Sequence, residues 1–523
     1  MNSSICIETL ATQVNRSPQP RVSALRRPPL LRRLGGLLLA LVAMNGATAA
    51  PNILWIMADD LRPQLGCYGD KTVRTPHLDT LAERSLRFDR AYVQSAVCSP
   101  SRNSMLSGLR PNTTGLLGFG KRVRSVVPDI VTLPQHFKEN GYHALGFGKI
   151  FHIYDESMLG SEDDPESWSE PLWLPTVPVW GPRQNKLRNR LIAEARAAGK
   201  TFSHPHDWPR AETWDDSDLP DDQMQDGQTT KMAVEFLHSR RDHSEPFFLA
   251  VGYLRPHLPF NAPRRYWDLY AAGSMTLPTH RQIPLSGFPF TINRGFVSNY
   301  HKMPASDAID DAFRRRYIQA YYACISYVDA CVGRLMTALD QSGHLENTVI
   351  VFLGDHGYQM GEYDSWGHKH ANFEISTRAP LLISKPSMSR AGEGTLEIVE
   401  FLDLYPTLCE LADLEHPKHL EGQSFAGLLD KESPQKGYAC SEIRRRAKNK
   451  RVTGHSVRTS QFRFTRWKDM HGNLVARELY DHRSDDRFKL SEPGLLETRN
   501  VIHDESFAAT IQQLETILET VFQ

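Results

Sequence analysis

The chain has 523 residues, of which 40 % are hydrophobic and 9 % aromatic, enough apolar material for one large domain and a smaller one. Lysine plus arginine and aspartate plus glutamate balance at 61 each, which argues against a nucleic-acid-wrapping protein and a long acidic tail. We therefore expect no nucleic-acid partner, and local groups must select any charged substrate.

The first fifty residues have the three-part pattern of a secretory signal. Four arginines within 26–33 precede an apolar run over 37–44, and the small residues at 47–49 suit cleavage. The run is too short to span a bilayer, and no later stretch is long enough. We therefore expect an exported protein, secreted or periplasmic, without stable membrane insertion. A disordered cytoplasmic leader is the alternative for 1–50.

Three apolar runs predict strands that are buried in a parallel sheet, and polar groups follow each of them. The runs cover 52–57, 246–253 and 348–353. They lead, respectively, into Asp59 and Asp60, into His257, and into Asp355 and His356. Since ligands bind at the carboxyl ends of strands in open α/β sheets, we expect these side chains to meet at one edge.

Helical periodicity between and after these runs predicts an alternating α/β domain with helices on both faces of the sheet. The helical segments cover 76–84, 132–140, 228–240, 307–341 and 402–412. Within 307–341, Cys324 and Cys331 belong to a buried apolar stripe. The cysteines are too scattered for a disulfide framework, and the lack of a C-x-x-C pair argues against a thiolate zinc site.

From residue 437 the pattern predicts a smaller α+β subdomain. Alternation over 456–467 indicates a strand, 474–485 is its expected antiparallel partner, and 507–522 has a helical period. The chain is thus divided into a leader (1–50), a catalytic domain (51–436) and a C-terminal subdomain (437–523). Residues 155–225 lack periodicity and are expected to be an insertion on the substrate side, with a disordered excursion as the alternative.

The segment VCSPSRNSMLSG (97–108) places Cys98 at the start of a predicted helix. Pro100 suits the first turn, so Cys98 lies at the positive N-terminal end with Arg102 one turn away. Such a position suits a nucleophile, or an anionic substrate held beside one. The alternative is a buried structural cysteine that precedes a helix.

The carboxylates at the strand ends predict a metal site. Asp59, Asp60 and Asp355 would repel one another at one site unless a cation is present. Oxygen ligands with few imidazoles favour calcium over zinc. A lone Asp-Asp pair would more simply be a helix cap or a turn, but two clusters far apart in the sequence favour the metal.

Four sequence blocks match the signatures of one family in order. CSPSR at 98–102 and LSG at 106–108 match C-x-P-S-R and L-T/S-G, and NILWIMADD, GYHALGFGKIFH and VIVFLGDHGYQMGE match the other blocks. Over about 50–485 the chain resembles the type I sulfatases of the alkaline phosphatase superfamily, in their iduronate-2-sulfatase-like branch. The resemblance implies an α/β fold with a large mixed, mostly parallel sheet between helices and a smaller C-terminal subdomain.

The resemblance also implies the chemistry of Cys98. A separate formylglycine-generating enzyme would convert it to formylglycine, whose hydrated aldehyde attacks sulfur with one hydroxyl and expels sulfate when the other is deprotonated. The implied activity is hydrolysis of a sulfate ester on a sulfated sugar, such as a glycosaminoglycan or algal polysaccharide fragment. The alternatives are a phosphatase or phosphonate-ester hydrolase of the same superfamily and a non-catalytic protein that binds sulfated glycans.

Matching positions imply the calcium ligands, and one of them has two possible roles. The ligands are Asp59, Asp60, Asp355, His356 and the modified Cys98. Most members of the family carry Asn or Gln at the place of His356, whereas the iduronate type carries His. His356 therefore either binds the metal directly or hydrogen-bonds the sulfate.

The remaining roles belong to cations and histidines. The expected cations around the sulfate and formylglycine are Arg102, Lys149 and Lys369. His257 is the expected general acid for the leaving alcohol, and His152 would hold a sulfate oxygen. EYDSWGHKHANFE (362–374) is one residue longer than is usual in the family, so His368 or His370 could occupy the place assigned to Lys369.

Substrate specificity is expected in the segments 155–225 and 284–306, which match no signature. Four arginines could meet a uronate or a second sulfate, or could simply be solvated charges. They are Arg183, Arg188, Arg190 and Arg210.

Overall fold

A computed structural model describes residues 50–152, 163–202, 208–305, 308–433, 435–484 and 497–523. The expected leader, except for residue 50, lies outside the described residues, and so do 153–162 and 203–207 of the expected insertion. Both assignments therefore stay predictions.

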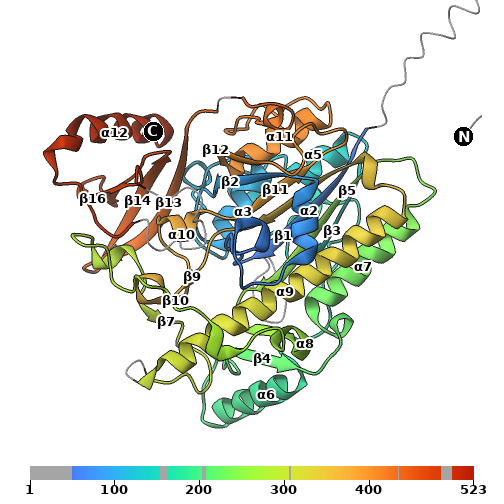
Figure 1. The fold of residues 1–523 in the computed structure, drawn as a ribbon, viewed down its shortest axis with the longest axis horizontal. Helices are drawn as coiled ribbons and strands as arrows, with labels where there is room; N and C mark the ends of the chain where they lie inside the picture. Colours follow the sequence, from blue (N-terminus) through green and yellow to red (C-terminus); the bar gives the residue numbers. More distant parts are fainter. Residues whose placement is uncertain (1–49, 153–162, 203–207, 306–307, 434, 485–496) are drawn as a thin grey trace, which may run out of the picture. The chain divides into compact units, whose positions relative to one another are not determined.

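Within the described residues, the centre of the fold is a mixed sheet of seven strands in the order β12-β2-β11-β8-β1-β5-β3 (Figure 1). The strands are β1 (Asn52–Asp59), β2 (Leu86–Tyr92), β3 (His143–Gly148), β5 (Phe247–Pro256), β8 (Thr348–Gly354), β11 (Leu381–Ser384) and β12 (Gly394–Glu400). β3, β5, β1 and β8 are parallel, and β11 runs antiparallel to both β8 and β2. This arrangement confirms the expected mixed, mostly parallel sheet.

Side chains of β1 alternate between two apolar cores, as the period of two in a strand requires. Leu54 and Ile56 face a core that includes α2 (Pro76–Glu83), α7 (Gln225–Ser239) and α9 (Asp311–Gln341). Ile53, Trp55 and Met57 face a core that includes α3 (Cys98–Ser107), α5 (Leu133–Glu139) and α11 (Leu404–Leu411). Helices thus cover both faces of the sheet, and Figure 1 shows α7 and α9 running side by side on one of them.

The predicted helices are confirmed with small shifts at their ends. α9 begins after Asp310, whose carboxylate accepts a 2.8 Å hydrogen bond from the Phe313 N–H and caps the helix. Cys324 and Cys331 on α9 are fully buried, as their spacing predicts. All six cysteines that the structure describes are free.

Shorter elements connect and flank the main sheet. They are α4 (Pro111–Thr114), α6 (Pro182–Ala197), β4 (Trp214–Ser217), β6 (Phe260–Pro263), α8 (Arg264–Trp267), β7 (Gly295–Phe296), β9 (Gln359–Met360), β10 (Ser365–His368) and α10 (Glu374–Thr377). Single turns of 3₁₀ helix include Gly66–Tyr68, Asp221–Gln223, Pro289–Thr291, Glu362–Asp364 and Phe401–Asp403.

The C-terminal part is an antiparallel sheet in which each strand pairs with the next. It comprises β13 (Tyr438–Ala447), β14 (Lys450–Thr459), β15 (Phe462–Asp469) and β16 (Leu474–Asp481), and α12 (Ala508–Val521) packs on it. The single strand expected over 456–467 is wrong, because a turn at Ser460 and Gln461 divides it between β14 and β15. The partnership with 474–481 is confirmed.

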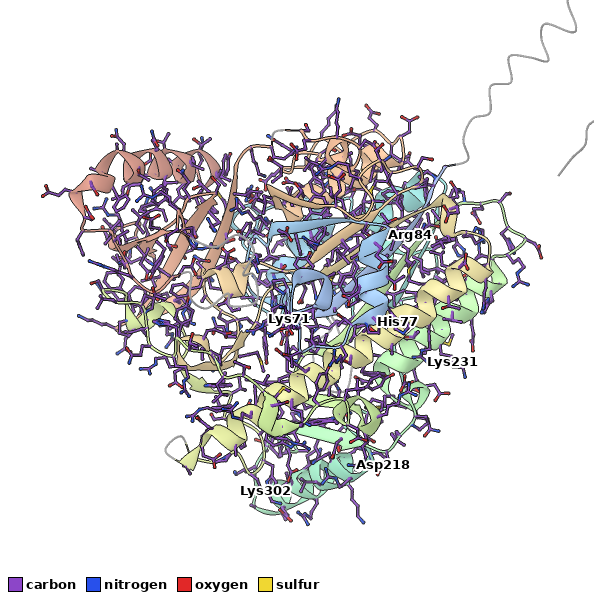
Figure 2. All side chains as sticks on the ribbon, viewed as in Figure 1. Lys71, His77, Arg84, Asp218, Lys231 and Lys302 are labelled. Carbon is purple, nitrogen blue, oxygen red and sulfur yellow. The ribbon has the colours of Figure 1, made fainter. Side chains whose placement is uncertain are left out.

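Residues 50–523 form one compact unit, so the division at residue 437 stays a prediction. Figure 2 shows His77 of α2 and Lys231 of α7 at the surface beside α9. Among the described residues, no helix is long and apolar enough to cross a membrane.

Candidate active site

Two adjacent parallel strands deliver the first carboxylates of the site. Ala58 of β1 pairs with Gly354 of β8, so Asp59 and Asp355 leave the sheet at the same edge. The Asp355 N–H donates to the Ala58 carbonyl at 3.1 Å, and the Asp60 N–H donates to Asp355 Oδ1 at 3.0 Å. Asp60 adopts a left-handed conformation with φ of 62°, which short polar side chains tolerate better than most. The sharp turn keeps all three carboxyl groups at the strand ends.

Cys98 is the first residue of α3, as its sequence context predicts, and its side chain meets both strand ends. Val97 caps the helix in an extended conformation. The Cys98 Sγ lies 3.3 Å from Asp59 Oδ1 and 3.2 Å from His356 Nε2. Residue 98 is 1 % exposed, so the structure places the thiol inside the carboxylate cluster.

The donor atoms are close enough together to hold one cation. One ligand atom from each of Asp59, Cys98, Asp355 and His356 lies within 4.8 Å of the others, and Asp60, Cys98 and His257 form a second such group. His356 Nδ1 lies 2.8 Å from the Gly357 carbonyl, so it carries the proton and leaves the Nε2 lone pair toward the cluster. A donor set rich in carboxylate oxygen fits a hard divalent cation.

The charges within the cluster support this fit. Burial raises the pKa of Asp60 to about 6, although Lys369 opposes the shift. Burial also acts to raise the pKa of Asp59, but the cations around it, chiefly Lys149, hold it well below its usual range. Crowded buried carboxylates of this kind are stabilised by a divalent cation.

Buried cations surround the carboxylates. Arg102 Nε donates a 2.8 Å hydrogen bond to Asp355 Oδ2, and its Nη1 donates to the carbonyls of Lys149 and Ile150. The Lys149 ammonium contacts Asp59 Oδ2. These positive groups balance part of the negative charge of Asp59 and Asp355.

Of the three candidates at 368–370, Lys369 is the residue whose side chain the structure brings to the carboxylates. Its Nζ lies 2.5 Å from Asp60 Oδ1, and the side chain is buried. His368 and His370 are only partly buried, and burial lowers both of their pKa values, that of His368 to about 4. The geometry therefore favours Lys369 for the contact with Asp60.

The two expected catalytic histidines differ in their placement. His257 Nε2 lies 3.8 Å from Asp60 Oδ2, and its Nδ1 lies 2.5 Å from the Leu258 carbonyl, so Nε2 faces the cluster. Burial, followed by Lys369, holds the pKa of His257 well below its usual range. His152 packs against the ring of Phe119 at a centroid distance of 4.9 Å and belongs to neither group of ligand atoms among the described residues.

The surroundings of Cys98 do not activate it as a thiolate. Burial, followed by the charge of Asp59, raises the pKa of the Cys98 thiol well above its usual range. A reactive thiolate needs the opposite shift. The position at a helix N-terminus is therefore outweighed by desolvation and by the neighbouring carboxylate.

Two further residues, which the sequence analysis did not assign to the site, hold its backbone in place. The Ser101 hydroxyl donates to the carbonyl of Asp355. The Tyr321 hydroxyl donates a 2.7 Å hydrogen bond to the Asp60 carbonyl from the middle of α9. Ser101 lies within the CSPSR block, which is a usable signal, whereas Tyr321 reads only as part of the buried stripe of α9.

The four arginines proposed for substrate contact have other neighbours. Arg183 lies 3.4 Å from Asp215, and Arg190 lies 3.6 Å from Glu194 on the same helix. Arg188 lies over the ring of Trp180, and Arg210 lies over the ring of Tyr300.

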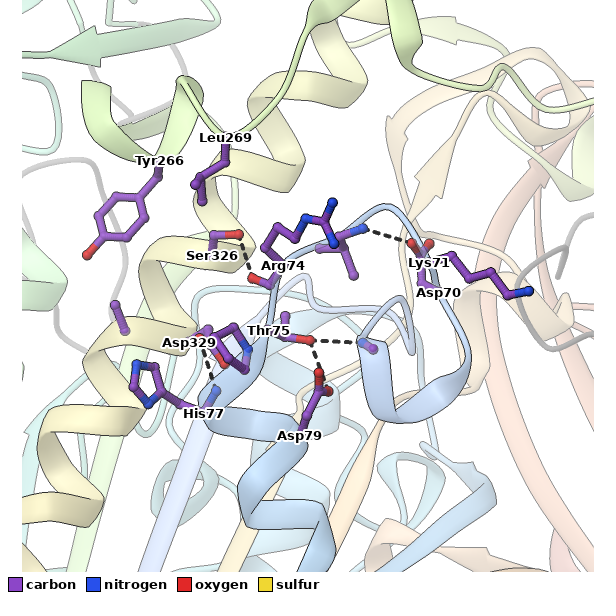
Figure 3. Close-up of a pocket in the computed structure, with 14 residues that line it drawn as sticks. Asp70, Lys71, Arg74, Thr75, His77, Asp79, Tyr266, Leu269, Ser326 and Asp329 are labelled. Atoms are coloured by element: carbon purple, nitrogen blue, oxygen red, sulfur yellow. Dashed lines mark hydrogen bonds between the residues drawn. The ribbon is translucent and has the colours of Figure 1, made fainter.

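A pocket of about 730 Å³ lies apart from this cluster, between the segment around α2 and the helix α9 (Figure 3). Its carboxylates serve local structure. Asp329 Oδ1 accepts a 2.7 Å hydrogen bond from the Leu78 N–H, and Asp79 Oδ1 accepts one of 2.7 Å from the Cys67 N–H. The pocket therefore does not combine the groups needed for catalysis in the way the strand-end cluster does.

The chain is similar to several known proteins. The family model described as Sulfatase matches residues 51–414, and one described as N-sulphoglucosamine sulphohydrolase, C-terminal, matches 361–523. Iduronate 2-sulfatase of Mus musculus is 32 % identical over 95 % of this chain and 100 % of its own length; that of Homo sapiens is 34 % identical over 81 % and 86 %. A phosphonate monoester hydrolase from Silicibacter pomeroyi shares the fold, with a TM-score of 0.68 at 21 % identity over 90 % of this chain and 94 % of that one.

Proposed function

Because the chain belongs to the sulfatase family and is thus a sulfuric ester hydrolase, we propose that it removes sulfate from a sulfated sugar through a formylglycine made from Cys98. The observation that carries the proposal is the convergence of the Cys98 side chain with Asp59, Asp355 and His356 within 4.8 Å. These groups come from three separate segments and are all buried. A structural cysteine would not require two carboxylates and an imidazole around it.

The proposed cation is calcium, held by Asp59, Asp60, Asp355, His356 and residue 98. Such an ion supplies positive charge that polarises a bound sulfate and favours ionisation of a nearby hydroxyl. The Nδ1–H of His356 donates a hydrogen bond to the Gly357 carbonyl, so the lone pair of Nε2 is available to a cation. We therefore favour His356 as a direct ligand over a role as a donor to the sulfate.

Formylglycine would supply, as a hydrated aldehyde, one hydroxyl for attack on sulfur and a second for release of the sulfate. The chain's own groups create the setting for that residue. Desolvation keeps the Cys98 thiol neutral, and the neighbouring carboxylate Asp59 can accept a hydrogen bond from a hydroxyl at position 98. Arg102 holds Asp355 in place and keeps the strand end closed around the site.

Lys149 and Lys369 are the proposed partners of the sulfate oxygens. Both ammonium groups are buried and point at the strand-end carboxylates, so they face the position where charge develops as the ester bond breaks. His152 follows Lys149 in the same block, and we propose that it holds a further sulfate oxygen.

His257 is the proposed general acid for the leaving alcohol. Its Nε2 faces the cluster while Nδ1 is fixed on the Leu258 carbonyl, so a proton on Nε2 is the one available for transfer. In the free site its pKa is low because of burial and Lys369. A bound sulfate brings negative charge beside the ring, which favours the protonated form before the bond breaks.

The proposed substrate class is a sulfated sugar from a glycosaminoglycan or an algal polysaccharide. The support is the resemblance to proteins named iduronate 2-sulfatase, one of which is matched over its full length. The phosphonate monoester hydrolase is similar at 21 % identity, which supports the shared fold and no particular substrate.

The test is a sulfate-release screen over sulfated mono- and disaccharides, with an aryl sulfate and a phosphonate monoester alongside. Release that disappears in Cys98→Ala is expected, and release that survives this change would contradict the proposal. Intact mass should show residue 98 lighter by about 18 Da when it is converted and anhydrous. An unconverted thiol in the native host, with binding but no turnover, would favour the glycan-binding alternative.

Two further proposals concern the export of the chain and the conversion of Cys98. We propose export to the periplasm or cell exterior, supported by the basic, apolar and small-residue pattern within 26–49. We also propose that a formylglycine-generating enzyme acts on CSPSR before folding, because residue 98 is 1 % exposed in the folded chain.

A further inference from the structure

Arg445 is a partly buried arginine of β13 that has no carboxylate partner in the part of the chain that the structure describes. Its Nε donates to the Phe290 carbonyl and its Nη2 to Asn293 Oδ1, both at 2.9 Å. Among the residues that the structure describes, its guanidinium makes no ion pair within 4.0 Å. Its neighbours Arg444 and Arg446 on the same strand are exposed.

The strand β13 brings Arg445 beside the candidate active site. Ile443 lies two residues earlier, so the two side chains share one face about 7 Å apart. Ile443 belongs to an apolar cluster with Val97, the residue that directly precedes Cys98. Phe290, whose carbonyl holds Arg445, packs against the same cluster.

A second link joins β13 to the segment that carries Lys369. Ile443 pairs with Gly454 of β14, and the Gly454 carbonyl accepts a 2.9 Å hydrogen bond from Asn372 Nδ2. Asn372 follows Lys369 by three residues. The start of α3 and the Lys369 segment therefore both contact the C-terminal sheet at the Ile443–Gly454 pair, two residues along β13 from Arg445.

The electrostatic setting of Arg445 is that of an uncompensated cation. Burial lowers its pKa to about 10, and no carboxylate opposes the shift. After burial, Arg445 is also the largest contributor to the lowered pKa of His368, which places the two groups in one electrostatic neighbourhood. Partly desolvating an arginine without a counter-charge costs free energy that a bound anion would recover.

We propose that Arg445 binds a second anionic group of the substrate, a carboxylate or another sulfate, while the scissile sulfate occupies the site around residue 98. This inference rests on the proposed function. Two of the guanidinium nitrogens are fixed on Phe290 and Asn293, so the remaining edge is oriented in advance. A planar guanidinium held in this way suits the paired oxygens of a carboxylate or a sulfate. Neutral His368 beside it can add a hydrogen bond.

The segment 290–293 gives the subsite its selectivity. It lies within 284–306, the expected specificity segment, and it leads directly into β7, where Gly295 pairs with Ser365 of β10. One short segment therefore fixes Arg445 and pairs with the strand that leads to Lys369. The distance between Arg445 and the site around residue 98 would therefore select substrates whose two anionic groups are separated by the same distance.

The test compares Arg445→Gln with Arg446→Gln, which removes an exposed charge from the same strand. Initial rates are measured on an aryl sulfate without a second charge, on a sulfated uronate glycoside, and on mono- and disulfated glucosamine. For Arg445→Gln, KM is expected to rise about 10- to 100-fold more for a substrate with the second anion than for the aryl sulfate. Arg445→Lys should restore part of the loss, and Arg446→Gln should change neither ratio.

The substrate that shows the effect identifies the ligand as carboxylate or sulfate. Equal losses on the aryl sulfate and on the substrates with a second anion would overturn the subsite and leave the proposed function intact. Should the wild type release no sulfate from any substrate, the proposed function fails, and calorimetry on Cys98→Ala then tests the subsite alone. Binding of the sulfated uronate glycoside that weakens about tenfold or more with Arg445→Gln in that background supports it, and unchanged affinity overturns it.

Discussion

Arg102 and Asp355 form an ion pair in which both side chains are fully buried, with Nε 2.8 Å from Oδ2. The pair joins α3, one turn after Cys98, to the end of β8. The Arg102 guanidinium also contacts the carbonyls of Lys149 and Ile150, after β3, and its Nη2 lies 4.0 Å from Asp59 Oδ1. The Arg102 side chain therefore connects three segments of the site: α3, the end of β8 and the residues after β3.

Replacing Arg102 with Gln is expected to destabilise the protein strongly. The change leaves Asp355 as a buried charge without its partner and two carbonyls without donors, and breaking a buried pair in this way costs about 3 to 5 kcal/mol. Urea unfolding at pH 7 with calcium present measures the free energy. The control is Arg190→Gln, which removes an exposed pair on α6 worth about 0.5 kcal/mol. Equal losses in the two variants would show that burial of the Arg102 pair has no energetic consequence.

Calcium is expected to stabilise the wild type and not Asp355→Asn. A ligand that binds only the folded state at a hundred times its Kd adds about 2.7 kcal/mol, and Asp355 Oδ1 and its neighbours are the proposed ligands. Thermal unfolding is followed with excess EGTA and with added calcium. Asp218→Asn is the matched control, since Asp218 is exposed and pairs with Arg264. A calcium-dependent rise in Tm of the same size in Asp355→Asn would remove this residue from the cation site.

The parts of the fold that the sequence predicts well are those with a strong local pattern. β1 and β8 are buried on both faces, so they appear as continuous apolar runs, and the acids that follow them stand out. α9 is long enough for the helical spacing of its apolar residues to repeat over many turns. The strand-end acids and the position of Cys98 at the start of α3 could therefore be predicted from local sequence, whereas Lys149 and Lys369 were assigned only through the family resemblance.

The elements that the sequence analysis missed depend on contacts between residues that are far apart in the sequence. β2 went unpredicted because Arg87 and Asp89 interrupt its apolar pattern, and they neutralise each other at 2.8 Å in the folded chain. The turn at Ser460 and Gln461 contains neither Gly nor Pro, so β14 and β15 read as one strand. Arg445 lies within a run of three arginines that looks exposed, but it donates hydrogen bonds to Phe290 and Asn293, which are distant in the sequence.

Substitution of Lys369 is expected to reduce turnover far more than substitution of His370. Lys369 contacts Asp60 at 2.5 Å and is a proposed partner of the sulfate oxygens, and removal of one group that stabilises developing charge costs about 10²- to 10³-fold in kcat. Sulfate release by Lys369→Met and His370→Gln is compared under saturating substrate. If His370→Gln shows the larger loss and Lys369→Met stays active, the histidine occupies the position that the extra residue in 362–374 left open.

The stability of the protein should fall as the pH rises from about 4.5 to 8, in part because of Glu442. Burial raises the pKa of Glu442 from 4.5 to about 8, and one of its carboxyl oxygens has no hydrogen-bond partner among the described residues. Between these values the folded state holds a proton that the unfolded state has lost, so unfolding becomes easier as the pH rises. Glu442→Gln should flatten this dependence in urea unfolding at pH 5.5, 7 and 8.5. The exposed Glu432→Gln should follow the wild-type curve, and a Glu442→Gln curve parallel to wild type would show that the carboxyl does not titrate in this range.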